Sequence, residues 1–368
     1  MATWQLLSNE VAEKRWDDAL LRLRCATPFQ TYAWGEYRRA LGWRTCHWAA
    51  IDNRGEIVAM MLGQVRQYAF KVGLIWCEGG PVGDLSVCGE DLQKAIRETT
   101  GLKRVYCRFR CDRPRHIEDA LRLTAEGWRR SWTTLTSNYS MQMELTPTES
   151  ELFARCERNW RRNFRRSEEA GLHIRQWTDP SVDEIHKTYV LMQSAKGIEE
   201  QHSREEIEQL LLNLKKHLVI YRCDDEHGEL LSLLGWLIHG NRATAVLSAT
   251  TEKGRAVHAS YAIFWAVLQH AKRIGVESCD LAGIDPIRNP GVYRFKRATG
   301  ATPLEYLGEW DWASAPWLRL LGNQAIARRQ RLRNAESLLK TPAAISLAPA
   351  SNRAANTEAL AQQRLAVH

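Results

Sequence analysis

Residues 283–300, with the sequence GIDPIRNPGVYRFKRATG, combine turn-forming residues with two aromatic side chains and a lysine. The stretch follows one apolar strand-like run and precedes another, so it is predicted to be a loop. If its central part is extended, Tyr293 and Phe295 share one face. Arg294 and Lys296 then share the other, which is typical of an aromatic-anchored loop with two solvated cations. The alternative is a cation held beside a reacting centre, where Lys296 would stabilise a developing oxyanion.

A second cluster of cationic side chains lies in residues 151–170, which are predicted to form one helix. Thr148 is expected to cap its start and Gly171 to end it. An apolar stripe of residues spaced by four would face the core, and it consists of Cys156, Trp160 and Phe164. Arginines cover the remaining surface: Arg155, Arg158, Arg161, Arg162, Arg165 and Arg166. This is either an ordinary basic face or a phosphate-binding surface, since the planar guanidinium makes paired bonds to phosphate oxygens.

The segment SATTEKGRAVHASYAIFWAVLQHAKRIG, residues 248–275, predicts a loop that opens a long helix. In an acyl-CoA-binding domain, glycines in such a loop let backbone N–H groups and the helix N-terminus bind the pyrophosphate. Here Arg255 fills the first position of that pattern, but His258 and Ser260 stand where the glycines should be. Their side chains would obstruct a close approach of the backbone. The sequence therefore disfavours acyl-CoA as a ligand.

Two cysteines and a histidine in VYCRFRCDRPRH, namely Cys107, Cys111 and His116, could be read as metal ligands. The alternation of this stretch instead predicts a strand with one buried face, made of Val105, Cys107, Phe109 and Cys111. No second ligand pair follows at zinc spacing, so neither a metal nor another cofactor is expected. A Ser–His–Asp pattern, a Walker loop and HExxH are also absent from the sequence.

The composition predicts a folded protein with a cationic surface. The chain of 368 residues has 44% hydrophobic and 26% charged residues and a net charge of +8. This charge favours an anionic partner such as nucleic acid, phosphate groups or an anionic membrane surface. The first residues lack the pattern of a secretory signal, and no apolar run approaches the ~20 residues that span a bilayer. With nine scattered cysteines, most simply read as reduced thiols, a cytoplasmic location is expected.

Apolar periodicity predicts the same order of elements twice: helices, a meander of antiparallel strands, a glycine-containing loop, a helix and a further strand. This order resembles the N-acetyltransferase-like (GNAT) fold. We therefore expect an α+β protein of two tandem GNAT-like domains, with mixed, mostly antiparallel sheets flanked by helices. The predicted division is a first domain on the acceptor side (1–145), a second on the donor side (146–320), and a basic, then alanine-rich tail (321–368). The tail is expected to be mobile.

Four pieces of the sequence together resemble the Fem family of peptidoglycan-bridge aminoacyltransferases, also called FemABX-like proteins. They are PFQTYAWGEYRRALGW, the arginine-rich segment ending RNFRRSEEAGL, SATTEKGRAVHASYAIFWAVLQHAKRIGVESCDLAGI and GVYRFKRATG. The resemblance covers about residues 25–315 and implies two GNAT-like domains. It also implies transfer of an amino acid from aminoacyl-tRNA to an amine of a peptidoglycan precursor. The long helical arm of some members is absent, which is typical of the smaller, arm-free type.

The resemblance implies roles for individual residues. Phe295 and Lys296 match the family's Phe-Lys pair, whose lysine is implicated in transfer and in engaging tRNA. Arg161 and Arg162 fall in the segment that binds the precursor's phosphates. Arg38, or the adjacent Arg39, lies near a cationic position with a similar role in the first domain. The expected site thus has Lys296 and Phe295 as catalytic residues and, as substrate-binding residues, Arg38, Arg161, Arg162, Tyr261 and Tyr293.

The chemistry of the expected reaction fits this set. An aminoacyl ester is already activated, so attack by an amine needs positioning and charge stabilisation more than covalent catalysis. Lys296 would stabilise the tetrahedral oxyanion or the departing ribose oxygen. The general base is open, with Asp280 and Asp285 nearby in sequence as catalytic or structural residues. Partners expected from this interpretation are aminoacyl-tRNA, an anionic peptide or peptidoglycan-precursor acceptor, and the inner membrane face as a peripheral contact.

Two alternatives remain open from the sequence. One is an acyl-CoA-dependent N-acyltransferase of envelope polysaccharide biosynthesis, which predicts CoA binding. The other is a non-catalytic RNA-binding protein on the same scaffold, in which Lys296 would contribute to RNA binding and to no chemistry.

Overall fold

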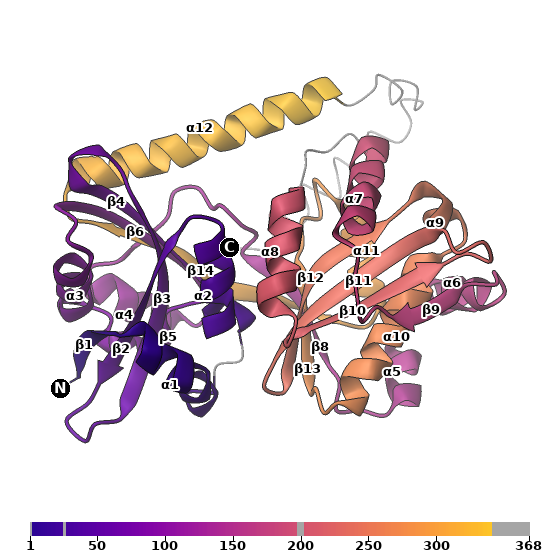
Figure 1. The fold of residues 1–368 in the computed structure, drawn as a ribbon, viewed down its shortest axis with the longest axis horizontal. Helices are drawn as coiled ribbons and strands as arrows, with labels where there is room; N and C mark the ends of the chain where they lie inside the picture. Colours follow the sequence, from indigo (N-terminus) through magenta and orange to yellow (C-terminus); the bar gives the residue numbers. More distant parts are fainter. Residues whose placement is uncertain (1, 25–26, 197–201, 341–368) are drawn as a thin grey trace, which may run out of the picture.

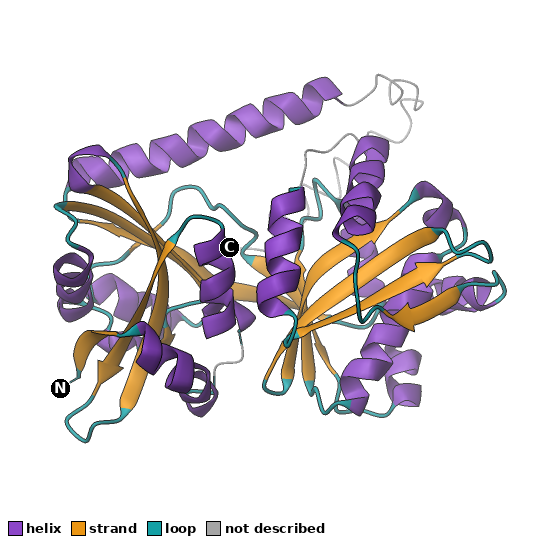
Figure 2. Ribbon diagram, viewed as in Figure 1, coloured by secondary structure: helices purple, strands orange, loops and turns teal. Residues whose placement is uncertain are grey.

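The computed structural model describes residues 2–24, 27–196 and 202–340. Throughout these residues, a single sheet of 14 strands connects the two halves of the molecule, and helices cover it (Figures 1 and 2). The strand order is β1-β2-β3-β4-β6-β14-β8-β13-β12-β11-β10-β9, with β5 beside β3 and β7 beside β14. The mixed α and β composition and mostly antiparallel pairing confirm the predicted fold class.

The first half of the chain follows the predicted order of elements. Its strands are β1 (Thr3–Leu7), β2 (Arg44–Ile51), β3 (Ile57–Gln67), β4 (Val72–Glu78), β5 (Val82–Gly83), β6 (Arg104–Pro114) and β7 (Arg129–Arg130). Its helices are α1 (Asn9–Arg22), α2 (Tyr32–Ala40), α3 (Glu90–Thr100) and α4 (Ile117–Ala125), with short 3-10 turns η1 (Pro28–Gln30), η2 (Ala69–Lys71) and η3 (Leu85–Val87). The edge strand β1, which pairs with β2, was not predicted from the sequence.

The second half repeats this order. Its strands are β8 (Tyr139–Glu144), β9 (His173–Gln176), β10 (Leu218–Asp224), β11 (Leu230–His239), β12 (Arg242–Thr250), β13 (Ser278–Gly283) and β14 (Thr302–Ala313). Its helices are α5 (Glu149–Arg155), α6 (Arg158–Glu168), α7 (Val182–Lys196), α8 (Arg204–Leu214), α9 (Glu252–Ala256), α10 (Ala259–Arg273), α11 (Pro290–Ala298) and α12 (Pro316–Lys340).

Each half contains one pair of parallel strands joined by a crossover helix. In the first half β4 runs parallel to β6 and α3 connects them. In the second half β12 runs parallel to β13, and the connection contains α10. Parallel neighbours require such a crossover, because a tight turn can join only antiparallel strands. The recurrence of this unit explains why the two halves have the same predicted order.

Strand β14 belongs to both halves. Its first residues, from Thr302 to Glu305, pair with β8, whereas Tyr306 to Ala313 pair with β6. The pairing shifts by one residue at Gly308, whose φ of +78° favours glycine. β8 in turn pairs with β13, so this strand lies in the second half of the sheet although its residues fall within the predicted first domain. The domain division at residue 145 stays a prediction.

The two faces of the sheet bury different cores, as β3 shows. Met61 packs with α3 residues such as Leu92, whereas its neighbours Met60 and Leu62 point to the opposite face, as alternation in a strand requires. This opposite core includes residues of both halves, for example Trp16 of α1 and Leu210 of α8. The shared core and the continuous sheet hold the two halves together.

The arginine-rich helix predicted at 151–170 is broken into α5 and α6. Thr148 caps α5 with the expected side-chain bond to the backbone N–H of Glu151, but the backbone is extended at Cys156 and Glu157. The Glu157 N–H donates to the carbonyl of Ala298 instead of continuing the helix, at 2.8 Å. This contact with the end of α11 places α6 against α11.

The loop predicted at residues 283–300 is also partly wrong, because residues 290–298 form helix α11. Asn289 caps its start by accepting a hydrogen bond from the N–H of Val292, and Pro290 occupies the first turn, where its missing N–H costs nothing. The predicted extended conformation of Tyr293 and Phe295 is therefore not present. Both side chains are partly buried against the core of the second half.

The C-terminal tail predicted from residue 321 is helical up to residue 340. It continues α12, which starts on the first half and passes above the second (Figure 1). Leu318 and Asn323 are buried, and the Asn323 side chain donates to Asp311 of β14 at 2.8 Å. Residues 341–368 of the predicted tail lie outside the described residues. Among the helices of the described residues, none combines the length and apolar character needed to cross a membrane.

Candidate active site

A cavity of about 460 Å³ lies where the sheet passes from one half to the other. The first half contributes Thr27, which directly precedes η1, and polar residues of β6. The second half contributes residues of its strands and of the segment before β8. Its polar lining comprises Thr27, Arg110, Asp112, Thr136, Ser137, Gln142, Arg242, Thr244, Ser278, Asp280 and Tyr306. Such a cavity at a junction between units is the usual location of a binding site.

Arg110 is the cation on one side of this cavity. Its guanidinium donates to both carboxylate oxygens of Asp112, with Nε–Oδ1 of 2.7 Å and Nη2–Oδ2 of 2.9 Å. Glu78 lies 3.8 Å from another of its nitrogens, and the Phe29 ring lies 5.2 Å from the guanidinium carbon. Burial raises the pKa of Glu78, and the nearby Arg110 and Arg38 oppose this shift. Arg110, Asp112 and Glu78 thus form a fixed cluster in which the acidic side chains compensate the charge of the arginine.

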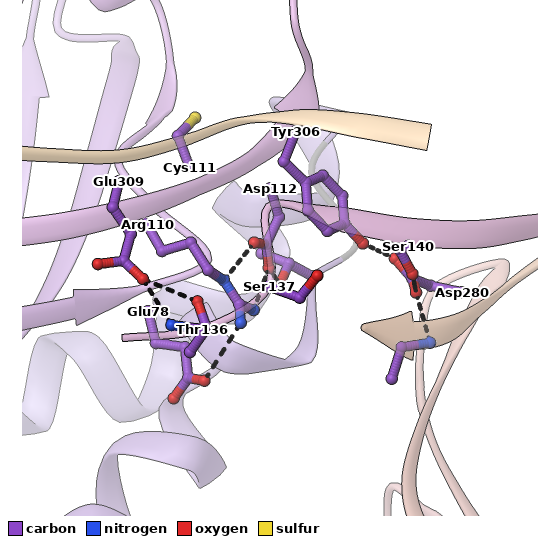
Figure 3. Close-up of polar contacts among 12 residues, drawn as sticks. Glu78, Arg110, Cys111, Asp112, Thr136, Ser137, Ser140, Asp280, Tyr306 and Glu309 are labelled. Atoms are coloured by element: carbon purple, nitrogen blue, oxygen red, sulfur yellow. Dashed lines mark hydrogen bonds and ion pairs between the residues drawn. The ribbon is translucent and has the colours of Figure 1, made fainter. Parts of the chain in front are cut away.

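Asp280 lies on the other side, at the end of β13. In Figure 3, Arg110 and its acidic partners lie to one side of Tyr306, and Asp280 lies to the other. The Asp280 carboxylate accepts hydrogen bonds from the hydroxyls of Ser140 and Tyr306 and from the backbone N–H of Ala282. Burial raises the pKa of Asp280, and the bonds from Ser140 and Ala282 oppose this shift. This carboxylate therefore fixes β8, β13 and β14 to one another at the cavity.

The backbone after Asp280 turns sharply. Ala282 has a φ of +63°, a left-handed conformation that costs roughly 1 kcal/mol in a residue with a Cβ. The ladder between β13 and β8 shifts at this place, between Asp280 and Gly283. Ala282 and Gly283 both line the cavity. Such strain is typical of functional positions, where the surrounding structure holds the backbone.

Lys296 of α11 is bound to this turned backbone. Its Nζ donates to the carbonyl of Ala282 at 3.0 Å and to that of Gly283 at 2.9 Å. Burial lowers the pKa of Lys296 to about 8, and the nearby Asp280 opposes the shift. The ammonium is consequently held directly behind two residues of the cavity wall, and its charge is lost as the pH rises through about 8.

Phe295, the neighbour of Lys296 in the sequence, points into a cluster of aromatic rings. Its ring lies 5.1 Å from that of Tyr261, 5.7 Å from Phe264 and 6.4 Å from Trp160. The cluster joins α6, α10 and α11 and fixes the orientation of α11. In this structure Phe295 therefore positions Lys296 and does not line the cavity.

The two tyrosines predicted to contact substrate also lie around α11. The Tyr261 hydroxyl accepts a hydrogen bond from the Asn163 side-chain amide of α6 at 3.1 Å. Tyr293 is partly buried, and the Arg297 guanidinium carbon lies 6.0 Å from its ring centroid. Neither tyrosine is part of the lining of the cavity.

The two arginines predicted on α6 differ in their environment. Arg161 donates from Nη1 to the carbonyls of Ala154 and Cys156, both at 2.8 Å, and thereby caps the end of α5. Arg162 is exposed. The pKa of His258, at the start of α10, is lowered by burial and by Arg166 and Arg162. Arg162 and Arg166 therefore face the N-terminus of α10. Because the end of a helix at its N-terminus is itself electropositive, it adds to the positive potential of these two cations.

Arg38 lies in the first half, apart from the other predicted residues. Its Nε donates to the Gln64 side chain at 2.8 Å, and the Trp43 ring lies 5.4 Å from its guanidinium carbon. Glu78 connects it electrostatically to Arg110 and thus to the cavity. Arg39, the other candidate, donates to Glu36, Asn9 and Thr45, so its guanidinium serves to hold α2 in place.

The sequence reasoning missed the charged residues of β6. It correctly predicted one face of this strand, because Val105, Cys107, Phe109 and Cys111 are all buried. The opposite face carries Arg110 and Asp112, which line the cavity, and their alternation with apolar residues was the available signal. His116 is exposed at the start of α4, away from the buried cysteines. Among the described residues, no group of three or more side chains could hold a metal ion.

Several solved structures share this fold. The structure of FemX matches 87% of this chain and 99% of its own, with a TM-score of 0.69 and 15% sequence identity. L-PGS from Bacillus licheniformis matches 88% of this chain and 98% of its own, with a TM-score of 0.52 and 15% identity. A tandem GNAT protein from the clavulanic acid biosynthesis pathway matches 86% and 99%, with a TM-score of 0.52 and 12% identity. The fold is the tandem GNAT-like fold that the sequence predicted.

A sequence match accompanies this fold. The sequence model of the FemAB family matches residues 198–321 of the chain. The matched region contains α8 to α11, the turned backbone at Ala282 and Lys296. No curated protein matches the chain in sequence. The resemblance to the Fem family predicted from the sequence is thus confirmed.

Proposed function

We propose that the protein is an aminoacyltransferase that moves an amino acid from aminoacyl-tRNA to an amine of a peptidoglycan precursor or a related peptide. The observation that carries this proposal is the position of Lys296, whose ammonium is fixed on the carbonyls of Ala282 and Gly283 at the wall of the cavity. The FemAB match over residues 198–321 and the tandem acyltransferase fold support the same chemistry.

In the proposed reaction, the acceptor amine attacks the carbonyl carbon of the aminoacyl ester and forms a tetrahedral intermediate. The bond from carbon to the ribose oxygen then breaks, the amide remains, and the ribose oxygen takes up the proton that the amine loses. The Lys296 ammonium stabilises the negative charge on the oxyanion or on the departing ribose oxygen, because it is desolvated and held in place. Phe295 and its aromatic neighbours keep α11, and with it Lys296, in position.

The residue that first accepts the proton of the amine has no assignment. Asp280 already accepts hydrogen bonds from two hydroxyls and one backbone N–H. Asp285 accepts from the backbone N–H groups of Ile287 and Arg288, at 3.0 and 2.8 Å, and stabilises a turn. Both carboxylates therefore have structural roles.

The conformation of the segment that precedes α10 favours aminoacyl-tRNA over acyl-CoA as the donor. The preceding segment is not an open glycine loop but the short helix α9, followed by His258 with a φ of +58°. Arg255 donates to the carbonyl of Thr250 at 3.1 Å, so its side chain is directed to the protein's own backbone. A CoA pyrophosphate would have to displace the His258 side chain to reach the helix N-terminus.

This donor preference can be tested by binding. We expect the purified protein to bind aminoacyl-tRNA with a strong dependence on salt, because the phosphates release counterions on binding. Acetyl-CoA is expected to show no saturable binding in calorimetry. Saturable acetyl-CoA binding without tRNA binding would favour the polysaccharide N-acyltransferase. Weaker RNA binding in Lys296→Ala, without any transfer by the wild type, would favour the non-catalytic alternative.

The pH dependence follows from the position of Lys296. Its pKa of about 8 means that the ammonium is present below this pH and is lost above it. We expect the rate of transfer to fall as the pH rises through about 8. In Lys296→Arg this decrease should be absent, because a guanidinium stays protonated throughout this range. Single-turnover rates of both proteins, measured from about pH 6 to about pH 10 so that the range brackets the titration of the lysine, would check this. An alkaline decrease that is identical in both variants would assign it to another group.

The arginines of α6 provide a matched pair of variants. Arg161→Ala removes two hydrogen bonds to backbone carbonyls and is expected to lower the free energy of unfolding by about 1 kcal/mol. Arg162→Ala is expected to change it by less than about 0.5 kcal/mol, because the side chain is exposed. Arg162→Ala should instead weaken binding of the phosphate-bearing acceptor. Urea denaturation and acceptor titration of both variants would check this, and unchanged acceptor affinity would remove Arg162 from the site.

A further inference from the structure

The connection between β3 and β4 projects an aromatic side chain into solvent. Phe70 is 93% exposed and Tyr68 is 55% exposed, both at the tip around η2. Phe70 and Lys71 have φ values of +57° and +56°, so two consecutive residues with side chains adopt the left-handed conformation. Each costs roughly 1 kcal/mol. An exposed phenylalanine held in this way indicates a contact with something outside the chain.

Cations surround this tip. The N–H of Lys103 donates to the carbonyl of Lys71 at 2.9 Å, so the start of β6 lies directly beside the tip. Arg66, Lys71, Lys103 and Arg104 are all exposed. Residues 57–77 and 100–111 contain no aspartate or glutamate. This end of β3, β4 and β6 is therefore apolar at its tip and positively charged around it.

Helix α12 extends the same surface. Its inner face is buried through Leu318 and Asn323, yet its outer face also carries apolar side chains, and these are Trp317, Leu320 and Leu321 at 46%, 42% and 53% exposure. The Trp317 ring centroid lies 5.1 Å from the guanidinium carbon of Arg104, the first residue of β6. This contact joins the outer face of α12 to the start of β6. Three exposed arginines follow on α12: Arg328, Arg329 and Arg331. Figure 1 shows α12 lying along the outside of the molecule from this corner.

We propose that this surface, defined by Tyr68, Phe70, Lys71, Lys103, Arg104 and the outer face of α12, docks on a bilayer that contains anionic lipids. Exposed aromatic and leucine side chains would enter the boundary between headgroups and acyl chains, and the cations would contact lipid phosphates. The long axis of α12 allows it to lie along the bilayer plane. The surface contacts the bilayer without crossing it. This inference does not depend on the transfer activity.

Other partners fit the surface less well. A two-fold dimer would place the same cations against one another, because an isologous interface brings each patch onto its own copy. Nucleic acid would satisfy the cations but would leave the protruding Phe70 and the apolar side chains of α12 without a partner of their own chemistry. Charge complementarity and the exposed apolar side chains together favour an anionic bilayer.

The proposal is tested by sedimentation of the full chain with vesicles. The wild type should bind vesicles of phosphatidylcholine with phosphatidylglycerol and should bind pure phosphatidylcholine far more weakly. The triple variant of Lys71, Lys103 and Arg104 to alanine should lose about 100-fold in affinity, since each cation near an anionic surface contributes about fivefold. Phe70→Ser should lose about tenfold, as an aromatic side chain no longer leaves water. Near-UV circular dichroism would verify that the variants remain folded.

Matched controls lie on the second half of the molecule. Leu212→Ser removes an apolar side chain that is 67% exposed, and the double variant of Lys215 and Lys216 to alanine removes two exposed cations. Both should bind the anionic vesicles like the wild type. Equal binding by Phe70→Ser, the triple variant and the wild type would overturn the proposal. It would also be overturned if Phe70→Ser abolished a concentration-dependent dimer, or the triple variant abolished RNA binding, while binding to vesicles stayed unchanged.

Discussion

Lys296→Ala is expected to lower the single-turnover rate of aminoacyl transfer on the order of 100-fold, with a small effect on folding. The expected loss is that of one donor that stabilises an oxyanion, about 3 kcal/mol of transition-state free energy. The two carbonyls that Lys296 contacts lie next to the cavity, so water can replace the ammonium there. Lys296→Arg should retain part of the rate because it keeps the charge.

The chain offers a matched control for this variant. Lys272 of α10 also donates from Nζ to two backbone carbonyls, those of Leu145 and Pro147, but unlike Ala282 and Gly283 these two residues do not line the cavity. Lys272→Ala should therefore lose a similar pair of hydrogen bonds and retain the rate of transfer. A similar loss of rate in both variants would mean that Lys296 acts only by supporting the fold.

The largest expected effect on stability is that of Arg108→Ala. The side chains of Arg108 and Glu309 are 1% and 0% exposed, and Arg108 Nε lies 2.7 Å from Glu309 Oε2. Glu309 also accepts from the backbone N–H groups of Leu135 and Thr136, at 3.0 and 2.8 Å. The variant would leave this carboxylate buried without its cation, which typically costs about 3–5 kcal/mol. Urea denaturation would measure this as a lower midpoint.

The control for Arg108 is a more exposed pair near the ends of the same two strands, since Arg115 directly follows β6 and Glu305 belongs to β14. Arg115 lies 2.6 Å from Glu305, and their side chains are 48% and 32% exposed. Arg115→Ala is expected to change the free energy of unfolding by about 1 kcal/mol at most, because water screens the pair. If Arg108→Ala cost no more than Arg115→Ala, the buried pair would not be needed to join β6 and β14.

The elements that could be predicted from the sequence are those whose apolar pattern repeats along the chain. The alternation of β6 placed Cys107 and Cys111 in the core, and the capping pattern at Thr148 located the start of α5. The break after α5 could not be predicted, because no glycine or proline marks it. It depends on Arg161 and on the carbonyl of Ala298, which is distant in sequence.

Two further differences have local causes. The sequence Asn-Pro-Gly was interpreted as a turn, although Asn289 followed by Pro290 is also typical of a helix start, and this is its role in α11. The basic composition after residue 320 was interpreted as a mobile tail. Its helical part up to residue 340 depends on Asn323, which reaches Asp311 of β14, a contact between elements that composition does not reveal.

The residues of the candidate site also divide into those that a local sequence pattern predicts and those that depend on contacts between distant elements. A sequence motif predicts Lys296 and Phe295 as site residues, which stays a prediction, and the structure adds the turned carbonyls at Ala282 and Gly283 that hold the lysine. The alternation of β6 could have placed Arg110 and Asp112 on the face opposite the core, but their position in a cavity depends on the pairing of β6 with β14. A cavity between units depends on pairing across the sheet, which no local sequence pattern records.

The central proposal, transfer from aminoacyl-tRNA, is tested most directly by one measurement. The purified protein is incubated with a mixed pool of radiolabelled aminoacyl-tRNAs and cell-envelope precursors, with and without RNase. We predict label in an acid-stable product, absent after RNase treatment and reduced on the order of 100-fold in Lys296→Ala. No transfer from the tRNA pool, together with label in the product when acetyl-CoA or a longer acyl-CoA is supplied, would contradict the proposal.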